Sequence, residues 1–297
     1  MSDNFSDLSV VIVTYKTDLN ILEKCLSSID PSIKVFIIEN SSKFINENQI
    51  LNNYKNVSIF CTGTNLGYAK GNNYGLKIIN TNYALILNPD IVCESNYFKN
   101  IKDYLSNNID FCIIGSQYLD NQIYKPAGFF NSNFNLNDAI KLKDYNLYEV
   151  DWVVGCSILL NLKKFKTKTV FDENFFLFFE EFDLCKKLKT NKEKVYSSSN
   201  LIVDHSGFKS STLVKNEIDL IKLRNWHFMW SYFYYHKKND GYFYALRNIL
   251  SRLVRSFLKF VFFTIFFNNK KRVKYLYRLL GLYNSILGKE SSFRIKN

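Results

Sequence analysis

The chain has 297 residues and a formal net charge of +12, and this charge is unevenly distributed. Residues 1–205 contain 21 lysines, no arginine and 23 acidic residues, a net charge of −2, whereas residues 206–297 contain 18 lysines and arginines against 4 acidic residues, a net charge of +14. This length allows a full α/β core with an additional region. The distribution excludes a uniformly basic protein and predicts a near-neutral domain followed by a basic, aromatic one.

The six cysteines form no Cys-x-x-Cys pair, and several lie in apolar runs. This pattern favours reduced core thiols in the cytosol over a disulfide framework or a zinc site. The acidic start, MSDNFSDLSVVIVTYK, is not typical of a signal peptide. The best candidate for a membrane span, residues 260–267 (FVFFTIFF), is far shorter than the roughly 20 residues required. We therefore expect a cytoplasmic protein without a spanning helix.

The first part of the chain alternates strand-like runs with helical patterns. The run at residues 8–14 (LSVVIVT) is continuously apolar or β-branched, as expected for a strand covered on both faces. Further strands are predicted at residues 34–39, 57–61, 83–87 and 111–115, with helices near 18–29, 68–79 and 94–106. These repeated units predict an α/β fold with a doubly wound, mostly parallel sheet. Ligands bind such sheets beyond the carboxyl ends of the strands.

The later part of this domain is less regular. Residues 117–150 are rich in asparagine and carry few periodic signals, so we expect an irregular excursion there. An apolar run at 152–160, a helix at 176–189 and a short strand at 201–203 follow.

Polar segments follow the first four strands, at the expected binding edge. They are Thr14-Tyr15, Glu39 to Ser42, TGTNLGYAKGNNYGLK and Asn88-Pro89-Asp90. The third segment has glycines that let backbone approach a ligand, and it opens a helix whose N-terminus favours anions. It contains neither GxGxxG nor a Walker sequence, which disfavours a dehydrogenase or an NTPase. A purely structural turn is the alternative.

Asp90 is a candidate metal ligand. Pro89 stiffens the turn after a buried strand and directs Asp90 into the crevice. Mg²⁺ or Mn²⁺ typically takes one or two carboxylates together with substrate phosphates. His205, directly after a predicted strand, is a candidate second ligand. The alternatives are that Asp90 caps the helix near residue 94 and that His205 is a structural or surface histidine.

The helix predicted at 176–189 places a carboxylate on its apolar face. At about 100° per residue, Glu181 falls in the middle of a stripe formed by Leu177, Leu184, Cys185 and Leu188. Glu180, Asp183 and Lys187 fall on the other side, where they can pair in water. A buried carboxylate is costly unless it is paired, metal-bound or kept for chemistry, so Glu181 is a candidate catalytic residue. The alternative is a glutamate paired with a lysine of another element.

Together these segments resemble a family 2 glycosyltransferase of the GT-A fold, in the branch of bacterial surface-polysaccharide rhamnosyltransferases and galactofuranosyltransferases. The matching segments are SVVIVTYKTDLNILEKCLSSI, IIENSS, TNLGYAKGNNYGL, LILNPD, DWVVGCSILL, FDENFFLFFEEFDLCKKLK and the HSG after it. They occur in order over about residues 8–212. The resemblance implies a GT-A (nucleotide-diphospho-sugar transferase) domain over residues 1–215, followed by a basic, aromatic helical region over residues 216–297.

The resemblance also implies residue roles. Asp90 corresponds to the last residue of the family's DxD-type motif, which holds a metal under the diphosphate, and His205 to a histidine that some members use as a metal ligand. Glu181 corresponds to the second acidic residue of the family's Glu-Asp motif, the catalytic base. The nucleotide-sugar would contact Thr14, Tyr15, Glu39, Asn65, Gly67, Gly71, Asn72, Asn88 and Asp90, and the acceptor would approach Trp152 and Gly155.

Two departures from the family pattern affect the donor site. The first Asp of DxD is Asn88, so binding of Mg²⁺ or Mn²⁺ would depend on Asp90 and His205. The family usually has an Asp after the second strand, where this chain has Glu39, and this difference could alter which nucleotide base the donor carries.

The implied reaction is a single displacement with inversion. Glu181, in a partly apolar pocket that raises its pKa toward neutrality, would take the proton of the attacking acceptor hydroxyl. The metal and backbone dipoles would neutralise charge on the leaving diphosphate. The family's usual base is Asp, so Glu180 or Asp183 could share or take the role. We expect Asp90, Glu181 and His205 to meet around one diphosphate-sized crevice.

Residues 221–297 combine Trp226, Trp230, the cluster SYFYYH and rows of arginine and lysine. We expect a monotopic attachment to anionic lipid, with these aromatics at the headgroup level, at the inner face of the cytoplasmic membrane. A helical cap or dimer surface is the alternative, so a homo-oligomer stays open. Nucleic-acid binding is disfavoured because no recognised RNA or DNA motif accompanies the charge.

The sequence therefore predicts an inverting, metal-dependent glycosyltransferase. It would move a sugar from a nucleotide-diphosphate donor to a saccharide acceptor, lipid-linked in this interpretation, during synthesis of a bacterial surface polysaccharide. The alternatives are a nucleotidyl- or phosphotransferase using the same crevice and a non-catalytic, membrane-associated protein that binds nucleotide-sugars.

Overall fold

The computed structural model describes residues 5–120, 123–125, 141–142, 145–205 and 217–295. The chain divides into two compact units. The first, the sheet unit, contains Met1–Leu66, Lys70–Phe171 and Leu184–Leu213. The second, the helical unit, contains Gly67–Ala69, Asp172–Asp183 and Val214–Asn297.

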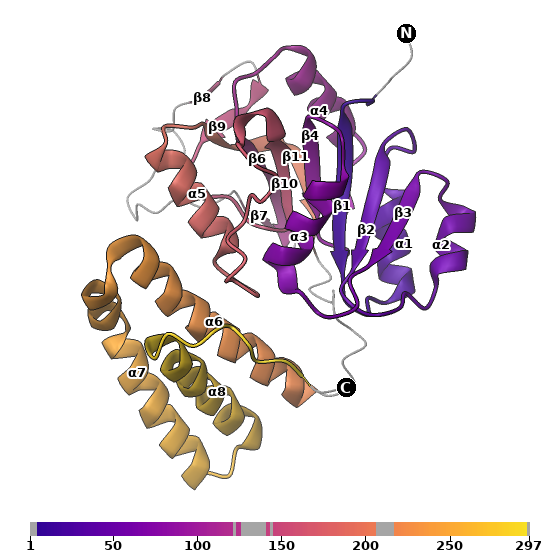
Figure 1. Cartoon of the computed structure of the whole chain (residues 1–297). Helices are drawn as coiled ribbons and strands as arrows, with labels where there is room; N and C mark the ends of the chain where they lie inside the picture. Colours follow the sequence, from indigo (N-terminus) through magenta and orange to yellow (C-terminus); the bar gives the residue numbers. More distant parts are fainter. Residues whose placement is uncertain (1–4, 121–122, 126–140, 143–144, 206–216, 296–297) are drawn as a thin grey trace. The chain divides into compact units, whose positions relative to one another are not determined.

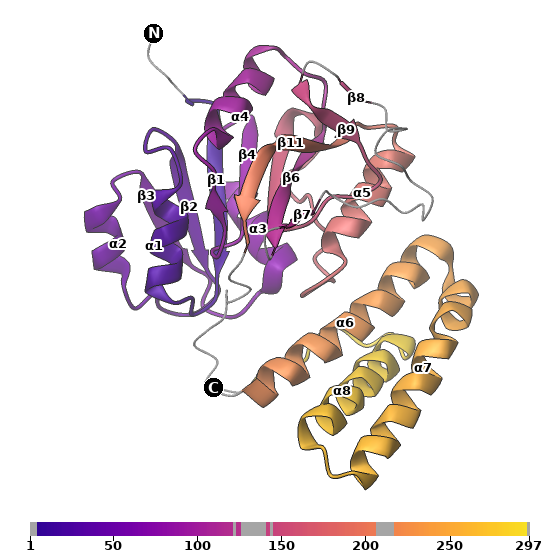
Figure 2. The same ribbon diagram turned by 180° about the vertical axis from the view of Figure 1, so that it is seen from behind.

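One mixed sheet forms the centre of the sheet unit (Figures 1 and 2). Its strands are β1 (Leu8–Thr14), β2 (Lys34–Glu39), β3 (Val57–Cys61), β4 (Tyr83–Leu87), β5 (Val92–Cys93), β6 (Ile113–Asp120), β7 (Ile123–Lys125), β8 (Lys141–Leu142), β9 (Leu147–Glu149), β10 (Ser157–Asn161) and β11 (Val195–Asp204). Their order is β3-β2-β1-β4-β10-β6-β11-β9-β8, with β5 paired to β11 and β7 to β6.

Strands β1 to β4 are parallel, whereas β10 runs antiparallel between β4 and β6. Strand β11 is parallel to β6. The carboxyl ends of β1, β2, β3, β4, β6 and β11 therefore lie at one edge of the sheet, where the sequence places the binding site.

Helices cover both faces of this sheet (Figures 1 and 2). Val10 and Ile12 of β1 lie in the main core cluster with apolar residues of α1 (Leu19–Ser27), α2 (Glu47–Asn53) and α4 (Tyr97–Ser106). Helix α3 (Gly67–Ile78) packs on the other face, where a Cβ atom on Gly75 would lie 2.4 Å from Cγ1 of Val11. Glycine therefore lets this helix lie directly on the strand. The continuous apolar run of β1 is explained by this double coverage.

The predictions for the first four strands agree with the structure, as do those for the helices at α1 and α3. The fifth strand begins two residues later than predicted and continues to Asp120, and α4 begins at Tyr97 rather than near residue 94. The sheet is more mixed than expected because β10 is inserted antiparallel.

The expectation of only a short strand at 201–203 was wrong, and most of the irregular excursion expected at 117–150 lies outside the described residues. The described part of residues 117–150 contains the end of β6 and the short strands β7, β8 and β9, which are too short to show a periodic signal of their own. Strand β11 extends over ten residues instead of three, because its polar half is buried: Ser198 is fully buried and its hydroxyl bonds to that of Tyr104 at 2.8 Å.

The cysteine pattern agrees with the sequence analysis. All six cysteines are free, five of them are buried, and Cys61 is exposed. Among the residues that the structure describes, no helix has the length and apolar character needed to cross a bilayer.

The helical unit consists of α6 (Glu217–Asp240), α7 (Tyr242–Ile265) and α8 (Asn269–Ile286), together with residues 172–183. We call residues 172–183 the loop, although its last four residues already form the first turn of the next helix. Helices α6 and α8 approach closely, since a Cβ atom on Gly281 would lie 2.1 Å from the carbonyl oxygen of Trp226. Trp226 and Trp230 are only 4% and 3% exposed. The expectation that these two indoles lie at the lipid headgroups is therefore wrong, because they form part of the core of this unit.

Helix α5 (Glu180–Thr190) begins four residues later than predicted. Phe178 and Phe179 have φ angles of 70° and 71°, which lie in the left-handed region and cannot continue a right-handed helix backward. Leu177 is therefore not part of the helix.

Candidate functional site

A buried polar network joins the carboxyl ends of β1 and β2. The Thr14 hydroxyl donates to Oε2 of Glu39 at 2.6 Å, and the backbone N–H of Lys16 donates to Oε1 at 3.2 Å. The N–H of Asn40 donates to the carbonyl of Thr14 at 2.8 Å. Glu39 is 1% exposed, so its carboxylate fixes the turn that carries Tyr15. Contact of Thr14, Tyr15 and Glu39 with a nucleotide stays a prediction.

The glycines of the third segment are explained by close packing. Gly67 has a φ of 80°, and a Cβ atom on it would lie 2.4 Å from the carbonyl oxygen of Phe176. This carbonyl accepts the N–H of Tyr68 at 2.9 Å. Gly71 faces the sheet, where a Cβ atom would lie 2.8 Å from Cγ1 of Val13. Wrapping of a nucleotide-sugar stays a prediction for Asn65, Gly67, Gly71 and Asn72.

Asp90 and His205, far apart in the sequence, lie together in the sheet unit. Asp90 follows β4 and His205 follows β11, and the short strand β5 pairs Val92 with Asp204. This pairing brings Nε2 of His205 to 3.7 Å from Oδ2 of Asp90. The ring of Tyr118 packs edge-on against His205 at 6.1 Å. The structure thus brings together the two residues that the sequence predicts as metal ligands.

This pair fits a divalent cation that is shared with a diphosphate. Oδ1 of Asp90 is buried and has no hydrogen-bond partner among the described residues, so it is available to a ligand. The N-cap of α4 is Asn96, which rules out the alternative that Asp90 caps this helix. Nowhere in the described part of the chain do three His, Cys, Asp or Glu side chains gather as a metal site. The remaining ligands would be substrate phosphates and water, as is usual for Mg²⁺.

The predicted acceptor side adjoins the end of β4. The backbone N–H of Asn88 donates to the carbonyl of Cys156 at 2.9 Å, next to Gly155. Trp152 and Gly155 are half-buried in the segment between β9 and β10. Val153 in the same segment packs over Gly115. A Cβ atom on Gly115 would lie 2.5 Å from the Cβ atom of Val153. Contact of Trp152 and Gly155 with an acceptor stays a prediction.

The burial of the acidic residues of α5 differs from the prediction. Glu180 and Asp183 are each 4% exposed, whereas Glu181 is half-buried. The expectation that Glu180 and Asp183 face solvent is therefore wrong. Glu181 is half-buried with a buried Oε2, and the predicted stripe at Leu184, Cys185 and Leu188 is buried. The physical reason for Asp183 is that Lys238 and Asn239 at the end of α6 pair with its carboxylate and cover it.

The two buried carboxylates have different surroundings. Burial, and secondarily the charge of Glu181, raises the pKa of Glu180 well above its usual range. Asp183 instead accepts hydrogen bonds from Nζ of Lys238 at 2.6 Å and from Nδ2 of Asn239 at 2.9 Å. Glu180 is thus a carboxyl that favours its neutral form, and Asp183 is a paired carboxylate.

Sequence analysis did not identify Lys238 and Asn239. They lie 55 and 56 residues after Asp183, at the end of α6, and only complementary charge could have indicated the pairing. Glu181 belongs to the helical unit, whereas Asp90 and His205 belong to the sheet unit, so the convergence of all three stays a prediction.

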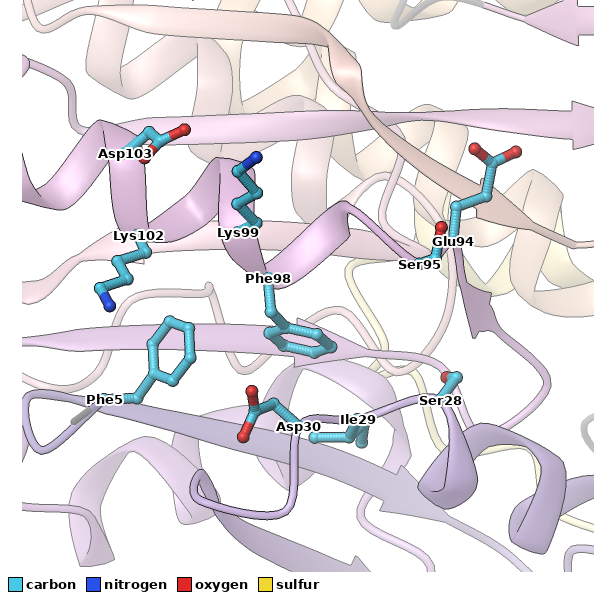
Figure 3. Close-up of a pocket in the computed structure, with 10 residues that line it drawn as sticks. All are labelled: Phe5, Ser28, Ile29, Asp30, Glu94, Ser95, Phe98, Lys99, Lys102 and Asp103. Atoms are coloured by element: carbon cyan, nitrogen blue, oxygen red, sulfur yellow. The ribbon is translucent and has the colours of Figure 1, made fainter. Parts of the chain in front are cut away.

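The sheet unit also encloses a cavity of about 570 Å³ away from these residues (Figure 3). Phe5 and Asp30, which precede β1 and β2, help to line it, so it lies toward the amino ends of the strands. In Figure 3 the rings of Phe5 and Phe98 lie next to each other, nearly perpendicular in an edge-to-face contact, with their centroids 6.3 Å apart. The rest of its lining extends along α4 to Glu94 and Ser95, which follow β5 (Figure 3).

Comparison with known proteins relates this geometry to an activity. Over 221 residues the chain is 25% identical to the low-salt glycan biosynthesis hexosyltransferase Agl10 of Haloferax volcanii, covering 69% of this chain and 71% of that protein. Over 183 residues it is 23% identical to the rhamnosyltransferase WbbL of Escherichia coli, covering 55% of this chain and 69% of that protein.

Among solved structures, that of GalNAc-T7 with UDP, GalNAc and Mn²⁺ is similar, with a TM-score of 0.54 and 11% sequence identity. The similarity covers 76% of this chain and 50% of GalNAc-T7, so this chain spans half of that one. At this identity the likeness concerns the fold alone, and it agrees with the predicted GT-A fold.

Residues 9–167 match the family described as Glycosyl transferase family 2, which is more than half of the chain. The match includes Asp90 and ends before Glu181 and His205. It confirms the resemblance drawn from the sequence and favours glycosyl transfer over the nucleotidyltransferase and non-catalytic alternatives. The chain belongs to glycosyl transferase family 2 and is a glycosyltransferase.

Proposed function

We propose that this glycosyltransferase moves a hexosyl group, of the rhamnosyl type, from a nucleotide-diphosphate donor to a saccharide acceptor with inversion. The observation that carries the proposal is the buried, unpartnered Oδ1 of Asp90 beside His205 at the carboxyl ends of the strands. The names of the hexosyltransferase and rhamnosyltransferase relatives support the transferred group. The UDP and Mn²⁺ of the GalNAc-T7 structure support the donor and the cation.

Asp90 and His205 would hold the cation, Mg²⁺ or Mn²⁺. When bound, this ion supplies positive charge that stabilises the diphosphate leaving group. Asp90 contributes a carboxylate oxygen to which no donor of the described residues is bonded. His205 contributes a ring nitrogen on the neighbouring β11 end, and a neutral imidazole is a suitable Mn²⁺ ligand.

Glu181 is the carboxylate that we assign as the base. Asp183 is occupied by Lys238 and Asn239, and Glu180 is buried with a raised pKa. Glu181 is the most exposed of the three, being half-buried, and its Oε2 is removed from water, which is a setting suited to a carboxylate that takes a proton. Its Oε atom would take the hydroxyl proton while the oxygen attacks the anomeric carbon and the diphosphate leaves from the opposite face. Such a single displacement inverts the anomeric configuration.

The proposal includes attachment to an anionic membrane surface, where a lipid-linked acceptor would be presented at the inner face of the cytoplasmic membrane. Leu250 and Leu258 of α7 are 59% and 61% exposed, and Phe267 just after it is 92% exposed. A protein surface rarely exposes so large an apolar patch without a partner. Arg255 and Lys259 line the same shallow depression as Leu250 and Leu258. Exposed apolar side chains interleaved with basic ones are typical of an interfacial helix.

Vesicle sedimentation tests the attachment. We expect the full chain to pellet with phosphatidylglycerol vesicles and far less with phosphatidylcholine vesicles. The change Leu258→Glu should lower pelleting severalfold, because it puts a charge on the apolar face. Ile45→Glu, at a site 79% exposed in the sheet unit, is the matched control and should pellet normally. Equal pelleting of both variants would overturn the attachment and leave the transfer reaction untouched.

A nucleotide-sugar panel tests the reaction itself. Thermal shift with UDP-, dTDP- and GDP-hexoses, with and without Mn²⁺, should show one nucleotide class that stabilises the protein more when Mn²⁺ is present. That donor should be hydrolysed slowly without acceptor. A protein that binds none of the panel and hydrolyses none of it would contradict the proposed function.

A further inference from the structure

The loop at residues 172–183 of the helical unit is held to α6 at both of its ends. Nζ of Lys238 lies 2.7 Å from Oδ2 of Asp172 and 2.6 Å from Oδ2 of Asp183. One lysine therefore bridges the first and last residues of this loop. The side chain of Asp183 is 5% exposed and that of Asp172 is 14% exposed, so both carboxylates are largely removed from water.

Further hydrogen bonds from α6 complete this bridge. Asn239 donates to Oδ1 of Asp183 at 2.9 Å, so both oxygens of that carboxylate are occupied. The hydroxyl of Tyr234 donates to Oδ2 of Asp172 at 3.0 Å. The Ser231 hydroxyl donates to the carbonyl of Leu177, in the middle of the loop, at 2.9 Å. We call Lys238, Asn239 and their two aspartates the clamp.

The segment inside the clamp is strained. Phe178 and Phe179 both have positive φ, which costs roughly 1 kcal/mol or more for each bulky residue. Such a conformation persists only where the surroundings over-determine it. The ring of Phe179 is enclosed by aromatic rings of α6 at 5.6 to 5.7 Å, and the clamp fixes the backbone on either side. The residues that follow directly are Glu180 and Glu181.

Burial of Lys238 disfavours its charge, but the hydrogen bonds that it donates to the two carboxylates outweigh this and raise its pKa. Lys238 is therefore a cation at neutral pH. A neutral side chain at this position would leave Asp183 buried with one of its two donors missing.

We infer that Lys238 is a positioning residue that holds the strained loop so that Glu181 has its working orientation. The inference rests on the proposed role of Glu181 as base. It makes α6 part of the catalytic machinery, although α6 lies outside the segment matched to the family. Lys238 itself need not touch either substrate.

Hydrogen–deuterium exchange of the full chain tests the clamp without any substrate. In Lys238→Met, we expect amides of residues 172–183 to exchange about tenfold faster or more, because the strained loop opens more often. Lys237→Met is the matched control: it removes the same charge from the same helix, and Lys237 contacts the ring of Tyr242 rather than an aspartate. Lys238→Arg can still bridge both carboxylates and should restore protection. Equal exchange in Lys238→Met and the control would overturn the inference.

Kinetics then separate positioning from simple destabilisation. With the donor that the wild-type protein hydrolyses fastest, Lys238→Met should lower kcat about tenfold or more and leave the donor KM within about twofold. Lys238→Arg should recover most of kcat. Should Lys238→Met misfold, Asn239→Ala can replace it, because this variant keeps the lysine. It should also lower kcat without changing the donor KM, by a smaller factor. Faster exchange with an unchanged kcat would overturn the positioning role.

These results are distinguishable from failure of the proposed function. If Glu181→Gln is inactive while Lys238→Met is fully active, the clamp inference fails and the function stands. If Glu181→Gln is fully active, the proposed base is wrong, and the positioning role of Lys238 falls with it.

Discussion

The sheet unit and the helical unit hold their functional side chains by different means. Asp90 and His205 follow strands, and the backbone pairing of β5 with β11 sets their separation. Glu180 and Glu181 follow two strained residues in a loop that a few side chains of α6 restrain. A backbone ladder tolerates most changes of neighbouring side chains, whereas a side-chain clamp does not. The helical unit should therefore be the more sensitive to remote substitution.

The largest expected effect is in the helical unit. Glu181→Gln should lower the rate of transfer about a thousandfold, because it removes the base and keeps the size of the side chain. Donor binding by calorimetry should be nearly unchanged. The neighbouring Glu180→Gln is the control: Glu180 is buried and favours its neutral form, so an amide should retain most activity. The reverse ranking of the two variants would move the base to Glu180.

The corresponding change in the sheet unit is Asp90→Asn. We expect about a hundredfold loss of turnover, because an amide is a poorer ligand for a hard cation than a carboxylate. The gain in donor-induced thermal stability on adding Mn²⁺ should also disappear. Asp103→Asn, which changes an exposed carboxylate of α4 at the cavity of Figure 3, should behave as wild type. An Asp90→Asn protein with a normal Mn²⁺ response would contradict the assigned ligand.

Substitution of one glycine in each unit shows how well the packing of that unit accepts an added methyl group. A Cβ atom on Gly281 would meet the backbone carbonyl of Trp226, whereas one on Gly75 would meet a side-chain methyl group of Val11. Both glycines lie inside helices, so the gain in helix propensity is the same. Backbone cannot yield as a side chain can, so Gly281→Ala should cost about 2 kcal/mol more unfolding free energy than Gly75→Ala. Equal losses in urea denaturation would contradict this.

A smaller, pH-dependent effect concerns His227 in the core of the helical unit. Burial lowers its pKa from 6.5 to about 3, and the imidazole bonds to Ser291 and to the carbonyl of Phe293. Between these values the unfolded chain binds a proton that the folded protein does not. Stability is therefore lost as pH falls from about 6.5, by about 1.4 kcal/mol per unit. Between pH 7 and 5, the unfolding free energy of His227→Gln should fall by about 2 kcal/mol less than that of the wild type. Equal falls in the two proteins would refute this.

The sheet unit was largely predictable from sequence, because its signals are local. Strands β1 to β4 are apolar runs of the expected length, and the polar residues after them mark the edge where Asp90 lies. The meeting of Asp90 with His205 was predicted from their places after strands and from the family resemblance, but the element that joins them was not. The two-residue strand β5 that brings them together has no periodic signal.

The helical unit was less predictable, because its determinants are not local. The helical spacing across residues 176–189 is regular, but tertiary packing places Phe178 and Phe179 in the left-handed region and starts α5 at Glu180. Glu180 and Asp183, which the sequence predicts to face solvent, are buried, and Asp183 is paired with residues of α6 that are distant in the sequence. The buried tryptophans of α6 likewise look like interfacial residues until their contacts with α8 are known.

Proton NMR of the reaction product tests the central claim most directly. The claim is that a single carboxylate-assisted displacement transfers the sugar, so the linkage formed must have the anomeric configuration opposite to that of the donor. We expect only the inverted anomer of the new glycosidic linkage, which cannot mutarotate once it is formed. A product that retains the donor configuration would require a second displacement and would contradict the account.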